Sequence, residues 1–488
     1  MKIRHLVGLA SVLLSCSLFS PCRSAHAAGS PNNSLQIGAA EIDITPPIGH
    51  RMAGYFDERL STGIHDPLHA KALVLKRGPE QIALVFCDLV GVSLTVTTNA
   101  RAQASQKTGI PVSNIMICAT HSHTGPLFDD VRRYYFHQAA VAKFGKDPQE
   151  KIYYPDFLIE RLVKVIARAQ AKLHPAQLEA GITQQEGLTF NRRYWMKNGK
   201  VAFNPGQLNP NIVRPAGPSD PDVGILLARD LPKVGTRSTA SQIPSALPFA
   251  GVTVFAMHSD TVSGTIYSAD YAYYLQETLR HTFGKRFISA FGAGTCGDLN
   301  HINVNKKEPV KGPEVAERLG TTLGQAVLRA STSLTPITSP SLAVRSTKLT
   351  VPLQDVTPEQ LADARSKIDK LGDTNTDFFI KVVAVKTLDL AMRGPTWPME
   401  VQVFRLDADH AIVCLPCEIF VELGLAIKQA SPFKHTIVIS ICNDRPSYIP
   451  TKKAFTEGSY EITNARVKPG AGEMLVEAAL KLLGELKQ

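Results

Sequence analysis

The sequence lacks several features that would place it in a simple class. It has no dense block of lysine and arginine with interleaved aromatic residues, so nothing in it indicates nucleic-acid binding. Beyond its first thirty residues it has no apolar run long enough to cross a bilayer. It also has no G-x-S-x-G motif, which argues against a serine nucleophile on a strand-to-helix turn.

Cysteine is scarce, and two of the eight cysteines lie among the first thirty residues. The other six mostly sit in apolar runs such as "ALVFCDLV", which predicts buried free thiols. Cys414 and Cys417 form a C-x-x-C motif, but no second pair lies nearby to complete a zinc knuckle. A disulfide among Cys414, Cys417 and Cys442 is the alternative for an exported protein.

The N-terminus has the pattern of a secretory signal. Lys2 and Arg4 precede an apolar stretch over residues 6–14, and small residues follow up to Ala27. We therefore expect a signal peptide over residues 1–27 and a secreted or periplasmic mature protein. An uncut membrane anchor is disfavoured because the apolar stretch is short. A lipoprotein cleaved at Cys16 is disfavoured because "LLSC" fits a lipobox poorly.

Positive charge is in modest excess. The formal net charge is +10, and removal of residues 1–27 lowers it to about +7. Such an excess favours contact with anionic membrane surfaces. The basic residues are scattered along the chain, however, and this pattern favours ordinary solubility.

Strand-like and helical patterns alternate along the chain. Near-continuous apolar runs indicate strands that are covered on both faces: "KALVLKR", "QIALVFCDLV", "NIMICAT", "VGILLARD", "FAGVTVFAMH", "FISAFGAG", "MEVQVFRLD", "HAIVCLPCE" and "HTIVISICND". Helical patterns occur at residues 155–173, at residues 357–372 with Thr357 as N-cap and Gly372 as terminator, and at residues 471–487. The stretch 232–248 reads as a long hairpin excursion. The interleaving predicts an α/β fold of mixed β-sheets flanked by helices.

Two histidines one residue apart end the run "NIMICATHSHTGP". In an extended segment, residues two apart point to the same side, so His121 and His123 should face one way. Imidazole is the commonest metal ligand, and ligands bind at strand ends of open sheets. Alone, however, such a pair is most often an ordinary surface or core pair. The aromatic and basic segment 127–148 follows directly, and we expect it to overhang the pair.

The pattern recurs at other strand ends. His258 ends "FAGVTVFAMH", Glu418 ends "HAIVCLPCE", and Tyr448 lies just past "HTIVISICND". Carboxyl ends of strands on one edge converge, so these side chains can form one site. Nitrogen and oxygen ligands without thiolate suit catalytic zinc. The alternative is that each of these residues is a satisfied polar group at a strand end.

Two further groups of residues are candidates for the site. In "FGAGTCGDLNHIN", glycines that allow close backbone approach precede Asp298, Asn300 and His301. A glycine turn with its usual Asx residues is the alternative. In "GLTFNRRYW", Arg192 can bind a carboxylate or a developing oxyanion, although a solvated arginine is the default.

An ordered set of motifs resembles the neutral/alkaline non-lysosomal ceramidase family, specifically its N-terminal catalytic domain. The resemblance runs from about residue 36 to beyond residue 460 and rests on "IGAAEIDITPPIGHRMAGY", "GIHDPLHAKALVL", "ATHSHTGP", "FNRR", "FAMHS", "GDLN", "LPCEIFVELG" and "SYIPTKKAFTEGSYE". It implies that residues 28–488 form one catalytic domain. It also implies a zinc-dependent amide hydrolase, in which a metal-activated water attacks the N-acyl amide bond of ceramide or a related lipid.

The resemblance also implies roles for individual residues. The family's zinc ligands fall on His121, His258, Glu418 and Tyr448, and His123 and Arg192 match positions near the scissile amide. Zinc, with Arg192 or His123 as donor, would stabilise the oxyanion, and His123 or His301 would pass a proton to the leaving amine.

The chain also departs from the family pattern. Asn300 and His301 replace a serine and a proline, and Cys417 replaces a glycine. The family's C-terminal immunoglobulin-like domain is absent from the sequence. A zinc hydrolase of another N-acyl or ester substrate, and a non-catalytic exported binding protein, are the alternatives. Whether His123 itself ligates the metal stays open at this point.

Overall fold

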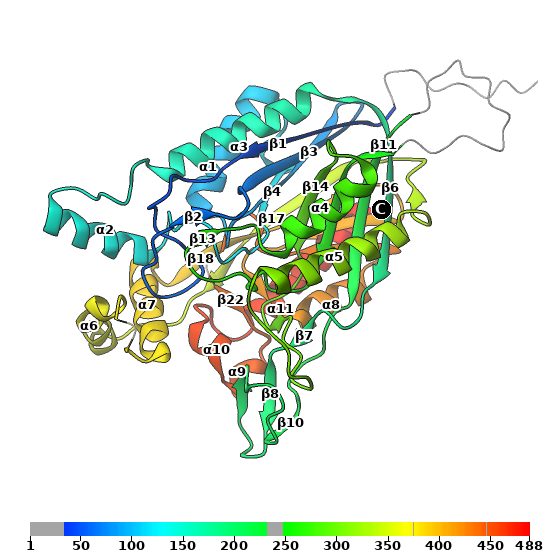
Figure 1. The fold of residues 1–488 in the computed structure, drawn as a ribbon. Coiled ribbons are helices and arrows are strands. Elements are labelled where there is room, and N and C mark those ends of the chain that lie inside the picture. Colours follow the sequence, from blue (N-terminus) through cyan, green and yellow to red (C-terminus); the bar gives the residue numbers. More distant parts are fainter. Residues whose placement is uncertain (1–33, 232–246, 374, 446) are drawn as a thin grey trace, which may run out of the picture.

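The structure, a computed structural model, describes residues 34–231, 247–373, 375–445 and 447–488 (Figure 1). Strands and helices interleave along that length, and the predicted α/β fold of mixed sheets flanked by helices is confirmed. The predicted signal peptide and nearly all of the excursion at 232–248 lie outside the described residues. The strands that flank this excursion pair antiparallel with each other.

The largest sheet has nine strands in the order β14-β12-β11-β6-β1-β3-β4-β5, with β16 beside β6. The pairs β4–β5 and β12–β14 are parallel, and the other pairs of this sheet are antiparallel. Its strands are β1 (Gln36–Asp43), β3 (His69–Arg77), β4 (Glu80–Cys87), β5 (Ile115–Ala119), β6 (His174–Gln184), β11 (Asp222–Asp230), β12 (Pro248–Phe255), β14 (Ile288–Ala293) and β16 (Thr335–Pro336). Strand β14 also contacts β1, β3, β4 and β5, so the two ends of the sheet curl toward each other.

A second sheet has the order β17-β18-β19-β21, and its pair β19–β21 is parallel. Its strands are β17 (Ala343–Pro352), β18 (Thr396–Arg405), β19 (His410–Cys414) and β21 (His435–Ile439). The remaining strands are short: β2 (Gly63–Ile64), β7 (Phe190–Asn191), β8 (Arg193–Met196), β9 (Val201–Phe203), β10 (Ile212–Pro215), β13 (Ile266–Tyr267), β15 (Leu299–Asn300), β20 (Glu418–Ile419) and β22 (Tyr448–Ile449). Strands β8, β9 and β10 form a projecting arm (Figure 1).

Helices cover the outer faces of both sheets. Helices α1 and α3 lie against the β1–β3–β4 region, α4 and α5 against β11, β12 and β14, and α8 and α11 against the second sheet (Figure 1). The helices are α1 (Leu94–Thr108), α2 (Val131–Phe144), α3 (Tyr154–Ala171), α4 (Tyr271–Phe283), α5 (Pro313–Ala330), α6 (Pro358–Ser366), α7 (Phe378–Arg393), α8 (Val421–Ala430), α9 (Ala454–Glu457), α10 (Tyr460–Asn464) and α11 (Ala471–Lys487), with 3-10 turns η2 (Val112–Asn114) and η3 (Ile368–Lys370).

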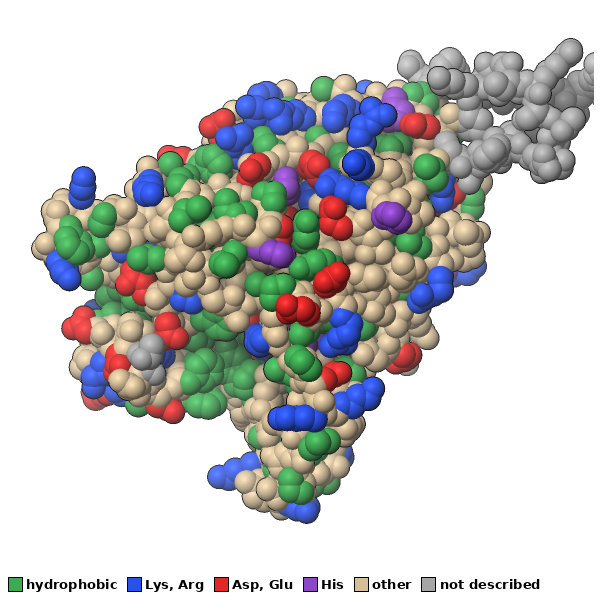
Figure 2. Space-filling model, viewed as in Figure 1, with side chains coloured by type: hydrophobic (Ala, Val, Ile, Leu, Met, Phe, Trp, Pro, Cys, Tyr) green, Lys and Arg blue, Asp and Glu red, His purple; other side chains and the backbone are tan. Residues whose placement is uncertain are grey.

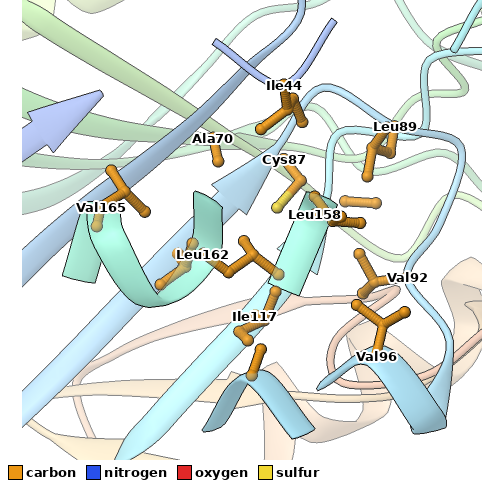
Figure 3. Close-up of a cluster of buried hydrophobic side chains, with 14 of the residues drawn as sticks. Ile44, Ala70, Cys87, Leu89, Val92, Val96, Ile117, Leu158, Leu162 and Val165 are labelled. Atoms are coloured by element: carbon orange, nitrogen blue, oxygen red, sulfur yellow. The ribbon is translucent and has the colours of Figure 1, made fainter. Parts of the chain in front are cut away.

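The apolar strands are apolar on both faces because both faces are covered. Side chains of one strand alternate between two cores, as the two-residue repeat requires. In β4, Val85 and Cys87 point toward α1 and α3, whereas Leu84 and Phe86 point into the core shared with the second sheet. Figure 3 shows the first of these cores, in which Cys87 and Ile117 meet Leu158, Leu162 and Val165 of α3.

Most sequence predictions of elements are confirmed. Each of the nine apolar runs contains a strand, and the helices at 155–173 and 471–487 are present. Thr357 forms the predicted capping box with Gln360. The predicted end at Gly372 was wrong, because α6 stops at Ser366. There the Lys367 N–H is shared between two carbonyls and the chain tightens into η3.

The six cysteines of the described residues are buried free thiols, as predicted, and no disulfide joins Cys414, Cys417 and Cys442. Among the described residues, no helix has the length and apolar character needed to traverse a bilayer.

Gly38 allows α3 to lie directly on β1, because a Cβ there would come within 2.1 Å of the Ala169 carbonyl oxygen. We expect Gly38→Ala to lower the free energy of unfolding by about 1–3 kcal/mol through overpacking. Gly484, in α11, has open space around it, so Gly484→Ala should raise the free energy of unfolding by about 0.5–1 kcal/mol. Urea denaturation of both variants provides the comparison. Equal effects of the two substitutions would contradict the close α3–β1 contact.

Candidate metal centre

Loops that follow the strand ends of both sheets meet at one place and are joined by backbone hydrogen bonds. The bonds run from Ala119 N to Ile441 O (3.2 Å), from Ser440 N to Ala293 O (2.8 Å), from His123 N to Ser259 O (3.2 Å) and from Gly297 N to Ile419 O (2.8 Å). Segments that are far apart in the sequence are therefore held in fixed register. The predicted convergence of strand ends follows from these bonds.

Two of the convergent histidines have a fixed orientation and a fixed tautomer. His121 Nδ1 lies 2.8 Å from the Val90 carbonyl oxygen, and His258 Nδ1 lies 2.8 Å from the Cys296 carbonyl oxygen. A carbonyl oxygen can only accept, so each Nδ1 carries the proton. Each neutral ring then turns the lone pair of its Nε2 inward, as metal-binding histidines do.

Glu418 brings a third acceptor to the same point. Its Oε2 lies 3.3 Å from His121 Nε2 and 3.2 Å from His258 Nε2. With both imidazoles neutral, three lone pairs face one another without a proton between them. His258 Nε2 and Glu418 Oε2 are buried and have no hydrogen bond within the described residues. Such an arrangement is unfavourable unless a cation occupies the centre or one imidazole takes up a proton.

The donor set and its spacing fit zinc. Zinc bonds of about 2.0–2.1 Å in a tetrahedron place ligand atoms about 3.3 Å apart. The separations of 3.2 and 3.3 Å around Glu418 match this value. Imidazole nitrogen and carboxylate oxygen are the ligands of catalytic zinc. His121, His258 and Glu418 therefore form a candidate metal centre.

His123 and Tyr448 lie at the edge of this centre. His123 Nε2 is 3.3 Å from His121 Nε2, so His123 is within coordinating reach as well. The Tyr448 ring stacks on the His258 ring at 6.4 Å. Strand β22 pairs with β20 so that Tyr448 lies opposite Glu418. All four predicted ligands are thus neighbours, and His123 joins them.

Burial and charge keep these groups in the protonation states that a metal requires. Burial lowers the pKa of His258 to about 4, and Arg192 adds to the shift. Burial also lowers the pKa of His123 well below its ordinary value, although Asp260 opposes the shift. Burial alone would raise the pKa of Glu418, but His121 and His258 hold it well below its usual range. Burial thus favours the neutral imidazole at His258 and at His123, and Glu418 stays a carboxylate.

The two histidines of the H-x-H motif face one site, although not for the predicted reason. The prediction assumed an extended segment, but β5 ends at Ala119 and His121 has a φ of +69°. Cys417, directly before Glu418, has a φ of +71°. Left-handed conformations cost energy in residues other than glycine and occur mostly where a site needs them.

Arg192 is buried beside the centre with two of its nitrogens engaged. Its Nε donates to Glu461 (2.8 Å), and one NH2 group donates to the Gly297 carbonyl (2.8 Å). The guanidinium lies over the Tyr448 ring, 5.4 Å from its centroid. Arg192 therefore lies against the face of the Tyr448 ring, with its hydrogen bonds directed to Glu461 and Gly297.

Asn300 and His301 are buried near the centre but turn toward other partners. The Asn300 side-chain amide donates to Asn204 Oδ1 (2.9 Å), and His301 Nε2 lies 2.6 Å from the Val310 carbonyl oxygen. Their predicted roles in the reaction stay predictions.

The sequence reading missed two side chains around the centre. Asp260 lies 3.7 Å from His123 and holds an ion pair of 2.6 Å with Lys311. Arg445 lines the cavity described next. Asp260 lies two residues after His258, and Arg445 lies three residues before Tyr448, so a charged residue close to a candidate ligand was the available signal.

A cavity of about 180 Å³ opens on the centre and is bordered by His121, His123, Glu418 and Tyr448. Asp129, Asp130 and Arg132 also line it, as the predicted overhang of segment 127–148 requires. Figure 2 shows a hollow with hydrophobic side chains between α7 and the arm of β8 and β10.

Fold and site together define an α/β protein with a candidate metal centre of nitrogen and oxygen atoms at converging strand ends. The chain resembles the neutral/alkaline non-lysosomal ceramidase family, whose N-terminal model matches residues 35–201. This matched range includes His121, His123 and Arg192.

Known proteins support the same resemblance. A neutral ceramidase of Pseudomonas aeruginosa is 26% identical over 313 residues, which cover 62% of this chain and 42% of that protein. The match thus spans less than half of the relative's length. The crystal structure of neutral ceramidase from Pseudomonas aeruginosa has a TM-score of 0.69 at 19% identity, and a ceramidase complexed with C2 has a TM-score of 0.68 at 17% identity. Each comparison covers 93% of this chain and 75% of the other chain. These structures establish the fold.

Asp298 links the loop of Arg192 to the loop of Glu418. Its carboxylate accepts from Val421 N (2.8 Å) and from Asn191 Nδ2 (2.9 Å), and burial raises its pKa to about 6. The folded chain therefore holds a proton that the unfolded chain, with a pKa of about 3.9, releases. This group's contribution to stability is complete below about pH 4 and is lost as the pH rises through 6.

Asp298→Asn removes this titration. We expect the free energy of unfolding of the wild type minus that of the variant to fall by about 1–3 kcal/mol between pH 4 and pH 7. Urea denaturation in EDTA measures it without interference from metal binding. Asp369→Asn, at an exposed position, is the control. A difference that stays flat across this range would show that Asp298 is not perturbed.

Proposed function

We propose that the protein is a zinc-dependent hydrolase that cleaves the amide bond of ceramide or a related N-acyl lipid. The observation that carries this proposal is the convergence of His121 Nε2 and His258 Nε2 on Glu418 Oε2, at 3.3 and 3.2 Å, with the last two of these atoms buried and without a hydrogen bond among the described residues. The names of the similar proteins supply ceramide as the first substrate to test. The proposal includes export through the signal at residues 1–27 and one catalytic domain over residues 28–488.

His121, His258, Glu418 and Tyr448 would hold the zinc. Bound zinc would supply a Lewis acid that polarises an amide carbonyl and lowers the pKa of a water molecule to about 7. The carbonyls of Val90 and Cys296 keep two imidazole lone pairs aimed at the centre. Burial raises the pKa of Tyr448 well above its usual value, whereas Arg192 favours the phenolate that a ligand requires.

His123 would move the proton. A neutral imidazole can accept a proton from water and pass it to the leaving amine, and the low pKa of His123 favours the second of these transfers. Asp260, 3.7 Å away, would orient the ring and offset the transient positive charge. Arg192 would act through Tyr448, since its Nε and one NH2 group already donate elsewhere.

Loss of a metal ligand should abolish both zinc binding and turnover. We expect purified wild type to hold about one zinc per chain and His121→Ala and His258→Ala to hold almost none. Amide hydrolysis should fall by at least about 100-fold in these variants, and in wild type treated with a chelator until zinc is restored. Elemental analysis and a ceramide hydrolysis assay provide the measurements.

His65→Ala removes an exposed histidine and should change neither zinc content nor turnover. Zinc-free wild type with full activity would refute the proposal. Zinc-loaded wild type that cleaves no amide would refute the hydrolase but leave the metal centre in place.

The roles of Tyr448 and His123 can be separated. As a ligand, Tyr448 should contribute to affinity, so Tyr448→Phe should weaken zinc binding by about 10- to 100-fold. As a proton carrier, His123 should not, so His123→Gln should retain zinc and lose about 10²- to 10⁴-fold in kcat. Zinc titration against a competing chelator, combined with steady-state kinetics, tests both. The reverse pattern would make His123 the ligand.

A further inference from the structure

The cavity beside the candidate metal centre has walls of two kinds. One wall is aromatic: Phe56 and Tyr460 both lie against Phe378, with ring centroids 5.6 and 5.3 Å away. Phe378 is 42% exposed, so this wall continues from the surface to Tyr448, which lies 5.6 Å from Tyr460. The other wall is polar and holds arginine and aspartate side chains. A substrate that fills the cavity must therefore be amphiphilic.

Three of the four arginines on the polar wall are already paired. Arg132 makes two bonds of 2.9 Å to Asp130. Arg393 and Arg466 both donate to Asp389, at 2.9 and 3.0 Å. These pairs hold the wall in shape and leave little charge free for a ligand.

Arg445 is the exception among the described arginines of this wall. Its nearest carboxylate is Asp130, at 3.8 Å, and that carboxylate already binds Arg132 in two places. Its Nε and NH2 are buried without a hydrogen bond to any described residue. The guanidinium therefore has one long ion pair, which it shares with Arg132, and two nitrogens that are free to bind a further anion.

The remaining carboxylates of the wall do not supply that partner. Asp444 is occupied by Trp397 Nε1 (2.5 Å) and by the backbone N–H of Leu94 (3.1 Å), and burial raises its pKa to about 6. Asp129 lies at the surface and accepts a hydrogen bond from Ser93.

The surroundings of Arg445 suit an anion. Ser93 and Leu94, at the N-terminus of the fifteen-residue helix α1, line the same cavity, and this end of a helix carries partial positive charge. Gly91 makes room for the arginine, because a Cβ there would come within 1.7 Å of Arg445 Cδ. Arg445 lies three residues before Tyr448, so an anion at Arg445 is close to an amide at the centre.

We propose that Arg445 binds an anionic group, a carboxylate or a phosphate, on the amine portion of the substrate. This inference rests on the proposed function and narrows it to N-acyl compounds whose leaving amine carries a negative charge. The acyl chain would lie along Phe56, Phe378 and Tyr460. A guanidinium forks onto either anion through two parallel hydrogen bonds.

Binding of uncleavable ligands to the full-length protein tests the inference independently of turnover. Dodecylsulfonyl-glycine carries a carboxylate, and dodecylsulfonyl-ethanolamine replaces it with a hydroxymethyl group. By calorimetry, wild type should bind the glycine compound about 10- to 100-fold more tightly. Dodecylsulfonyl-phosphoethanolamine shows whether phosphate is preferred to carboxylate.

Arg445→Gln should lose that preference. Its affinity for the charged ligand should fall by at least about tenfold, and its affinity for the neutral ligand should change much less. Arg445→Lys should keep part of it, because the charge remains without the fork. Arg345→Gln, an exposed arginine on β17, removes the same charge elsewhere and should change neither affinity. Should Arg445→Gln not fold, the comparison of the two ligand affinities in wild type still tests the inference.

Equal affinities in wild type, equal losses in Arg445→Gln, or no binding of either ligand would overturn the inference. Hydrolysis of dodecanoyl-glycine and dodecanoyl-ethanolamine with added zinc separates it from the proposed function. Cleavage of both at similar rates would leave the hydrolase standing and overturn the anion site. A preference in binding without cleavage of either would leave the anion site standing and overturn the hydrolase.

Discussion

Backbone hydrogen bonds between strand-end loops are the interaction on which the rest of this structure depends. The end of β5 bonds to the segment after β21, that segment bonds to the end of β14, and the loop after β14 bonds to β20. These bonds cross between two sheets whose ends would otherwise diverge. They bring three acceptor atoms, which would repel one another in isolation, to separations of 3.2 and 3.3 Å. Packing energy elsewhere in the cores must sustain this arrangement when no cation is present.

The arrangement of charge around the centre divides into two parts. Neutral imidazoles and one carboxylate face inward, and their carbonyl partners fix which nitrogen is free. Outside this set, arginine and aspartate side chains neutralise one another in pairs, apart from the guanidinium of Arg445. If every arginine of this wall were paired with a carboxylate, the wall would carry no net charge toward a substrate. The incompletely paired guanidinium of Arg445 leaves net positive charge on this wall of the cavity.

Much of the fold could be predicted from the sequence because buried strands are apolar on both faces, and runs such as "QIALVFCDLV" show this directly. The edge of the sheet that carries the site was predictable for the same reason: polar residues follow several such runs. What the runs do not encode is the partner of each polar side chain. Arg445 and Arg466 look alike in the sequence, yet only Arg466 makes a hydrogen bond to a carboxylate, because its partner Asp389 lies on a distant helix. The turn that orients His121 could not be predicted either, because no local sequence pattern indicates a left-handed backbone at this histidine.

Cys417 draws these points together. The family that the chain resembles has glycine at this position, and the left-handed backbone explains that preference, because glycine adopts it without steric cost. Here cysteine, with its side chain buried, adopts this unfavourable backbone conformation one residue before Glu418. Glycine at position 417 would relieve this strain, but it would also allow the loop to adopt several backbone geometries instead of one. Cysteine at this position therefore costs some stability and in return restricts the backbone beside Glu418.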